Sequence, residues 1–318
     1  MSFDARLTIV ALATFALANG IVSLAVWRLW PRFEISASPV MRAAALLQLR
    51  LTPSVLAAVA TLLALFAFIE YEPRANGERM GILLVILSSA AASLMALSAV
   101  RGLIGQLRTA RLVRAWARTA ERVKLPDMPG TGIPCFAIDT DFPIVAVVGL
   151  MRPRLFISRV VLASCTSEEL QAILRHEQGH IARHDNLRHL VFLSAPDCLA
   201  GTPFGARARQ MWRDATEEAA DDAAAPDVAT RLHLAAALVR VARLVPAGCV
   251  QTELPMSALY RGEPLETRVR RLLDSTPPPR YTRWRAWHAV AFVLLLSIGV
   301  ASAGSIQDLV EAAVKFLP

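Results

Sequence analysis

The chain has 318 residues, of which 55% are hydrophobic and 19% charged, and its formal net charge is +8. Soluble domains carry about 25% charged residues, so this composition excludes an ordinary soluble globule and also a disordered or collagen-like chain. The excess of basic residues would suit nucleic-acid binding, but the positions of these residues along the chain decide whether that interpretation holds. Four cysteines without a CxxC pair indicate neither a disulfide framework nor a zinc ribbon.

Uncharged apolar runs predict four membrane spans. A spanning helix needs about 20 predominantly apolar residues. The first run could also be a cleaved signal peptide, but its length and the arginines that follow it favour a retained helix. The four runs are residues 7–27, 51–69, 80–100 and 286–307.

Basic residues between the runs predict the orientation, because basic loops stay in the cytoplasm. Segment 28–50 has four arginines against one acid, and 101–124 has seven basic residues. Segment 70–79 has three acids against two arginines. We therefore expect 101–285 to be cytoplasmic, with the amino terminus and 308–318 outside. The positive charge then reflects membrane topology, and we expect the lipid bilayer and no nucleic acid as a partner.

The cytoplasmic segment is predicted to begin with a helix and a few strands. Residues 101–124 continue the third span as an Arg-rich helix. Glycines and prolines end it, and the last two of the following β-like runs flank a turn, which predicts a hairpin. The β-like runs are residues 135–138, 144–148 and 155–157.

The pattern is helical from Thr166 to about residue 245, with an interruption around 196–205. The short apolar run 189–199 contains Asp197, which favours a buried or interfacial helix over a fifth span. We therefore expect three parts: residues 1–107 with three membrane helices, 108–285 with the cytoplasmic domain, and 286–318 with the fourth span and a short tail.

The most informative stretch runs from Thr166 to His180. Thr166 and Glu169 form a capping box, which predicts that a helix begins here. His176 and His180 are four residues apart, so both imidazoles project from one face and can bind the same zinc ion. Glu177 follows the first histidine, where its carboxylate can take a proton from a zinc-bound water.

A catalytic zinc needs a third protein ligand. The metzincin pattern is excluded, because Arg183 and Asn186 stand where it requires glycine and histidine. His184 would lie about two turns from His176, too far to share one ion without distortion.

An acidic stretch further along offers better candidates for this ligand. Glu217 and Asp221 are four residues apart, giving one carboxylate to bind the metal and one to orient a histidine. Glu218 and Asp222 have the same spacing. The spacing alone therefore leaves the register open.

The run HEQGHIARHDN at 176–186, with GLMRPRLFI at 149–157 before it, closely resembles the BlaR/MecR-type membrane metallopeptidases. These are beta-lactam sensor-transducers and their sensorless relatives, and the same zincin core occurs in the HtpX and CAAX prenyl protease group. The resemblance runs from about residue 1 to 305. It implies an α-helical multipass membrane protein of four spans with a cytoplasmic α+β zincin domain of the gluzincin type.

In both groups the third ligand is the Glu of an ExxAD or ExxCD motif, which implies Glu217 here. The family's later P-L-x-x-R-I element matches residues 264–269 and implies a structural or site-supporting role for Arg268. The chain departs from the HtpX-like pattern at Glu263, where that group has a histidine. About a dozen residues follow the last span, so we expect no beta-lactam-binding domain and no acylation by a beta-lactam.

The sequence therefore predicts an integral membrane zinc endopeptidase of the cell membrane that cleaves proteins at its cytoplasmic face. A regulatory, antirepressor-like role is expected, with a transcriptional repressor as a candidate substrate that binds as a strand along the predicted hairpin. Two alternatives stay open. One is HtpX-like quality control of membrane proteins, and the other is a non-catalytic signalling scaffold that zinc stabilises.

Overall fold

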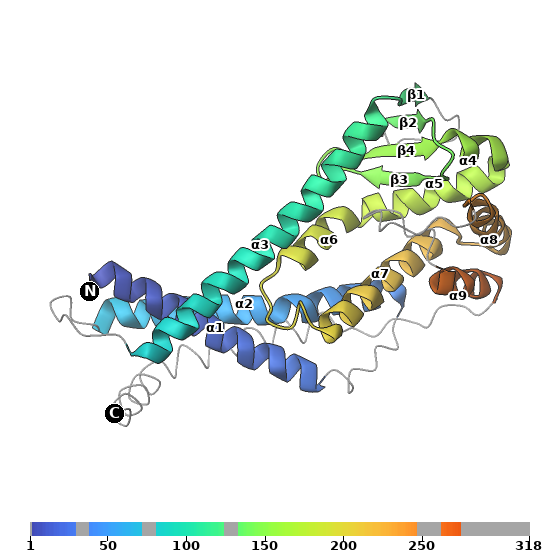
Figure 1. The fold of residues 1–318 in the computed structure, drawn as a ribbon. Helices are drawn as coiled ribbons and strands as arrows, with labels where there is room; N and C mark the ends of the chain where they lie inside the picture. Colours follow the sequence, from blue (N-terminus) through green and yellow to red (C-terminus); the bar gives the residue numbers. More distant parts are fainter. Residues whose placement is uncertain (1, 30–37, 72–80, 124–132, 247–261, 275–318) are drawn as a thin grey trace.

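Three long apolar helices form the first part of the chain (Figure 1). They are α1 (Phe3–Leu29), α2 (Pro39–Tyr71) and α3 (Ile82–Ala117), and each is long and apolar enough to cross a membrane. These helices confirm the first three predicted spans. The computed structural model describes residues 2–29, 38–71, 81–123, 133–246 and 262–274, so the predicted fourth span lies outside the described residues.

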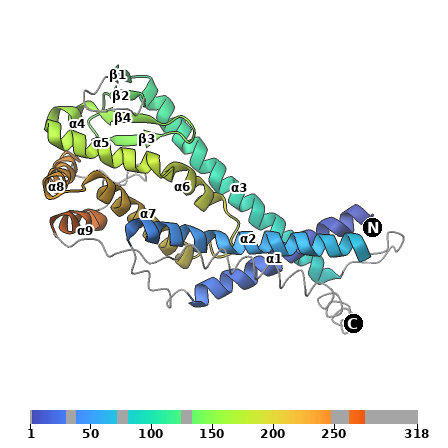
Figure 2. The same cartoon turned by 180° about the vertical axis from the view of Figure 1, so that it is seen from behind.

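The three helices pack as a bundle, and α3 continues beyond it. Phe15, Ala57 and Ala91, one from each helix, are buried against each other. The apolar run of α3 ends near Val100, but the helix continues through its Arg-rich part to Ala117, as the sequence predicted. Figure 2 shows this continuation leading from the bundle to a small sheet. One unbroken helix thus joins the apolar bundle to the rest of the structure.

A mixed four-stranded sheet has the order β1-β2-β4-β3, so β3 lies at an edge. β2 pairs with β4 in parallel, and the β3–β4 hairpin is antiparallel, as predicted. The helix predicted for 101–124 is wrong at its end, because 121–123 form β1. There Glu121 pairs with Ala137 in β2 and forms an ion pair with Arg159. The strands are β1 (Glu121–Val123), β2 (Cys135–Ile138), β3 (Val145–Val148) and β4 (Arg154–Ser158).

Both faces of the sheet are buried, which explains why β3 reads as a continuous apolar run. Ala146 and Val148 face one core, which includes Trp116 near the end of α3. Val145 and Val147 face the other core, which is closed by helices that follow the sheet. Side chains alternate between the two faces as the strand pleat requires.

Helices make up the part of the chain after the sheet. The predicted interruption around 196–205 corresponds to the connection between α6 and α7, although α7 already begins at Pro203, with Thr202 as its N-cap. The run 189–199 is helical only as far as Ser194. The helices are α4 (Arg159–Ser164), α5 (Ser167–Ala182), α6 (Asp185–Ser194), α7 (Pro203–Ala224), α8 (Val228–Arg243) and α9 (Gly262–Leu273).

The α6–α7 connection is bound between α1 and α2. Arg50 of α2 donates to Asp197 Oδ2 at 2.6 Å and to the Ala195 carbonyl at 2.8 Å. From α1, Ser23 donates to Asp197 Oδ1 at 2.9 Å, and Asn19 donates to the Pro196 carbonyl at 2.9 Å. Buried charges are stable only when they are paired, so this connection is held firmly against the bundle.

Candidate metal centre

Helix α5 begins as the sequence predicted. The Glu169 amide donates to the Thr166 hydroxyl, and the Thr166 amide donates to Glu169 Oε2 at 2.9 Å, which completes the capping box. The cap fixes the start of the helix, and four-residue spacing then brings His176 and His180 onto one face. Their rings lie edge to face, with centroids 4.8 Å apart.

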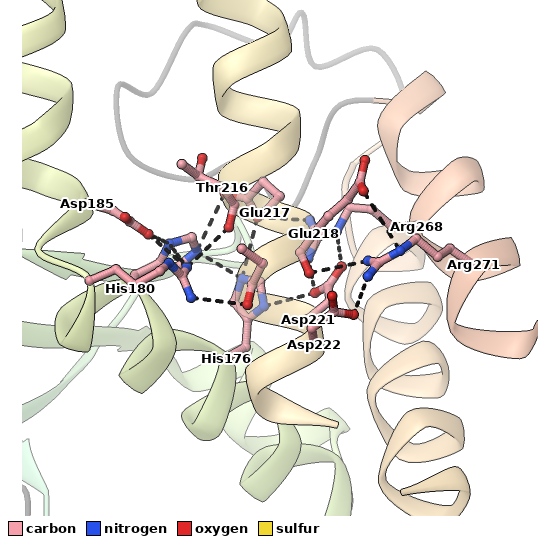
Figure 3. Close-up of polar contacts among 12 residues, drawn as sticks. His176, His180, Asp185, Thr216, Glu217, Glu218, Asp221, Asp222, Arg268 and Arg271 are labelled. Carbon is pink, nitrogen blue, oxygen red and sulfur yellow. Dashed lines mark hydrogen bonds and ion pairs between the residues drawn. The ribbon is translucent and has the colours of Figure 1, made fainter. Parts of the chain in front are cut away.

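Three donor atoms converge between α5 and α7 (Figure 3). The two Nε2 atoms of His176 and His180 are 3.1 Å apart. Glu217 places one carboxylate oxygen 3.4 Å from His176 Nε2 and the other 3.5 Å from His180 Nε2. Ligands about 2.0–2.2 Å from a tetrahedral ion lie roughly 3.3–3.6 Å from each other. The distances from each Nε2 atom to its nearest Glu217 oxygen fall in this range, and the two Nε2 atoms lie slightly closer together. We call these three side chains the donor triangle. His184 is not part of the group.

The opposite nitrogen of each ring faces a carboxylate. His176 Nδ1 lies 2.9 Å from Asp221 Oδ1, and His180 Nδ1 donates to Asp185 Oδ2 at 2.8 Å. Such carboxylates fix the ring orientation and leave Nε2 free to bind a metal. The sequence indicated Asp221 but missed Asp185. His184, in a left-handed conformation with φ of 55°, separates α5 from α6, and Asp185 follows it as the first residue of α6, within reach of His180.

Small residues let α5 and α7 approach closely at this point. A β-carbon at Gly179 would already be 3.4 Å from Ala220 Cα, so a larger side chain would push the helices apart. Arg183 joins the same helices from the side, donating to the Ala219 and Thr216 carbonyls at 3.1 and 3.2 Å. The donor triangle therefore depends on close packing of α5 on α7.

Arg268 of α9 connects the two carboxylates of α7. Its guanidinium donates to both oxygens of Asp221, at 2.8 and 2.7 Å, and lies 3.0 Å from Glu217 Oε2. Burial alone would raise the pKa of Glu217, but the charges of His180 and Arg268 outweigh it and lower that pKa to about 2. Glu217 is therefore ionised, as a metal ligand must be.

The structure distinguishes the two registers that spacing left open. Glu218 points away from the histidines and lies 2.6 Å from Arg42 of α2, and the Glu218 carbonyl accepts a hydrogen bond from Arg271. Asp222 also pairs with Arg271. Glu217 and Asp221 thus face the histidines, while Glu218 and Asp222 join α7 to neighbouring helices.

Glu177 lies on α5 between the two histidines in sequence and is only 6% exposed. Burial raises its pKa, although the nearby charges of His180 and His176 and a hydrogen bond with the Val147 backbone act in the opposite direction. A buried carboxylate with a raised pKa, beside a cluster of metal-binding donors, is typical of a general base.

We expect Asp185→Asn to weaken metal binding by about 10–100-fold, because the neutral amide no longer fixes the charge and orientation of His180. Metal titration of the purified apoprotein measures this. Asp222→Asn is the matched control, since it also removes a carboxylate from an arginine but leaves both histidine partners in place. Equal metal affinity in the two variants would contradict the role of Asp185.

Comparison with known proteins gives one result that agrees with this geometry. A search of curated proteins found no match. The family model described as BlaR1 peptidase M56 matches residues 79–242, which is more than half of the chain and includes α3, the sheet and the donor triangle. The resemblance noted in the sequence is therefore confirmed, and the chain belongs to the BlaR1 peptidase M56 family of membrane metallopeptidases.

Proposed function

We propose that this metallopeptidase is a zinc-dependent endopeptidase and that His176, His180 and Glu217 hold its zinc. The donor triangle carries this proposal, since two imidazoles and one carboxylate form a known ligand set of catalytic zinc. When bound, zinc would polarise the scissile carbonyl and make a water molecule more acidic. Asp221 and Asp185 would orient the two histidines, and Arg268 would hold Glu217 and Asp221 in place.

Glu177 is proposed as the general base. Its carboxylate takes a proton from the attacking water and returns that proton to the leaving amine. Burial favours the neutral form of Glu177, which makes its carboxylate a stronger base than an exposed one. A metal site that only stabilised a scaffold would need the three ligands but not this buried carboxylate, so its presence supports catalysis.

The substrate is proposed to bind as an extended strand along β3. The Ser158 amide donates to the Ile144 carbonyl at 2.8 Å, so these two residues form a hydrogen-bonded pair of the antiparallel ladder. Such pairs alternate along the strands with pairs that are not hydrogen-bonded. The N–H and C=O groups of Val145 and Val147 therefore point away from β4. Val147 contacts Glu177 through its backbone and its carbonyl accepts a hydrogen bond from Asn186, so this edge lies beside the proposed base and a peptide would pair with Val145. Pairing with an edge strand binds peptides with little demand on their sequence.

The site is proposed to face the cytoplasm, which the distribution of arginines around the first three spans supports. We also propose a regulatory role with a dedicated protein substrate, on the basis of the resemblance to sensor-transducers. Cleavage of many unrelated membrane proteins in cells would instead indicate quality control.

Membrane vesicles can test the activity and the orientation together. Inverted vesicles from bacteria that express the chain are expected to cleave added casein, whereas right-side-out vesicles are not. A zinc chelator should abolish the cleavage, and added zinc should restore it. Chelator-resistant cleavage would contradict the zinc mechanism, and equal cleavage by intact right-side-out vesicles would contradict the orientation.

A further inference from the structure

A second cavity lies next to the proposed site, between α3 and α6. We call it the α3–α6 pocket, and its volume is about 370 Å³. This lies within the range of about 300–1,000 Å³ typical of ligand pockets. Its walls are the Arg-rich part of α3, the end of β3 and one face of α6.

The shape of the pocket follows from two glycines of α3. At Gly102 a β-carbon would lie 2.2 Å from Ser194 Oγ, so α3 and α6 touch and close the pocket at this end. At Gly105 the nearest atom to such a β-carbon is Leu193 Cδ1, at 3.6 Å, so the helices have begun to separate. The pocket opens from there toward the turn after β3.

The lining of the pocket is mainly apolar. Its surface consists largely of side chains such as Val113, Val148, Leu190 and Leu193, and no carboxylate is among the described residues that line it. The larger, apolar part of the lining suits an uncharged apolar group. The polar residues of the lining are Gln106, Thr109, Arg114, Asn186 and His189. The pocket lies beyond Val100, where the apolar run of α3 ends, on a segment that carries Arg108, Arg111 and Arg114. This position argues for a cytoplasmic ligand rather than a lipid chain.

The pocket adjoins the proposed site. Gly149, Leu150 and Asn186 line both the α3–α6 pocket and a smaller cleft of about 90 Å³ that contains His180. Asn186 stands at this junction, where its side-chain amide donates to the Val147 and Gly149 carbonyls at 3.1 and 3.2 Å. A peptide that runs along β3 past the metal ligands would therefore meet the opening of the pocket next.

The geometry points to a substrate subsite: the α3–α6 pocket binds one large apolar side chain, such as Leu, Met or Phe, of the peptide being cleaved. This inference rests on the proposed function and adds its substrate class. Asn186 holds the end of β3 so that the edge strand and the pocket keep their relative positions.

Ala110 offers a direct test, because it lines the pocket and is exposed. Ala110→Phe places a ring where the substrate side chain would lie, and Ala110→Leu is a milder version in case the larger residue impairs folding. Ala115→Phe is the matched control, since Ala115 is also exposed on α3 but does not line the pocket. The full-length protein digests a proteome-derived peptide library, and mass spectrometry identifies the cleaved bonds.

We expect the wild-type protein to select large apolar residues at one position near the cleaved bond. In Ala110→Phe the ratio of kcat/KM for Phe peptides to that for Ala peptides at this position should fall about tenfold or more. Ala115→Phe should keep the wild-type ratio.

Cleavage that depends on Glu177 but has no apolar preference, or keeps its preference in both Ala110 variants, would overturn the subsite and leave the proposed function standing. If the Ala110 variants change only the lipid that co-purifies with the protein, and not the cleavage preference, the pocket binds a lipid and the subsite is also overturned. Absence of any cleavage that depends on Glu177 would overturn the proposed function, and the subsite with it.

Discussion

Glu177→Gln is expected to lower turnover by about 10²–10⁴-fold, because the amide cannot accept a proton from the attacking water. Glu177 is outside the donor triangle, so this variant should keep its fold and its full metal content. Cleavage of casein and metal analysis on the same preparation measure both properties.

Glu168→Gln is the matched control for this change, since Glu168 lies on the same helix, is exposed and is remote from the donor triangle. It should retain wild-type turnover. A cellular phenotype that requires His176 and His180 but survives Glu177→Gln unchanged would show that the metal serves structure only. The peptidase mechanism would then give way to the scaffold alternative.

Glu217→Ala should remove the metal almost completely, because it deletes one of the three proposed ligands that the described residues bring together. The loss of affinity should exceed the ~10–100-fold that follows removal of an outer hydrogen-bond partner. Glu218→Ala, one residue further on, should keep about one metal ion per chain, because Glu218 pairs with Arg42 and Arg271 instead. Metal content after purification compares the two variants.

The opposite result, metal retained in Glu217→Ala and lost in Glu218→Ala, would place the register one residue away. Arg42→Ala helps to separate binding from folding. It removes the partner of Glu218 on α2 without touching the triangle, so it should keep its metal even where it lowers stability.

Local patterns in the sequence predicted much of this structure. Apolar length predicted α1, α2 and α3, and the capping box predicted where α5 begins. Four-residue spacing placed His176 and His180 on one face. In each case the determining interactions are within a few residues of each other, so the sequence shows them directly.

Features that depend on distant contacts were harder to predict. β1 has only three residues, and it is a strand because it pairs with β2 rather than through any apolar alternation of its own. Asp185 contacts His180 across His184, whose left-handed conformation no local pattern indicates. The choice of Glu217 over Glu218 came from family resemblance, since it depends on how α7 faces α5, Arg268 and Arg271. The orientation in the membrane, the fourth span and the role of each site residue remain predictions.

The connection between α6 and α7 has a mechanical consequence. Helix α7 begins next to this connection, and Glu217 lies 14 residues after Pro203, a distance of about 21 Å along the helix axis. A tilt of α7 by roughly 3° about its first turn would therefore move Glu217 by about 1 Å. Displacements of this size at a catalytic centre cost on the order of 10² in rate. A small tilt at the start of α7 thus becomes a larger displacement at Glu217, and the packing of α1 and α2 around Asp197 determines the position about which α7 would tilt.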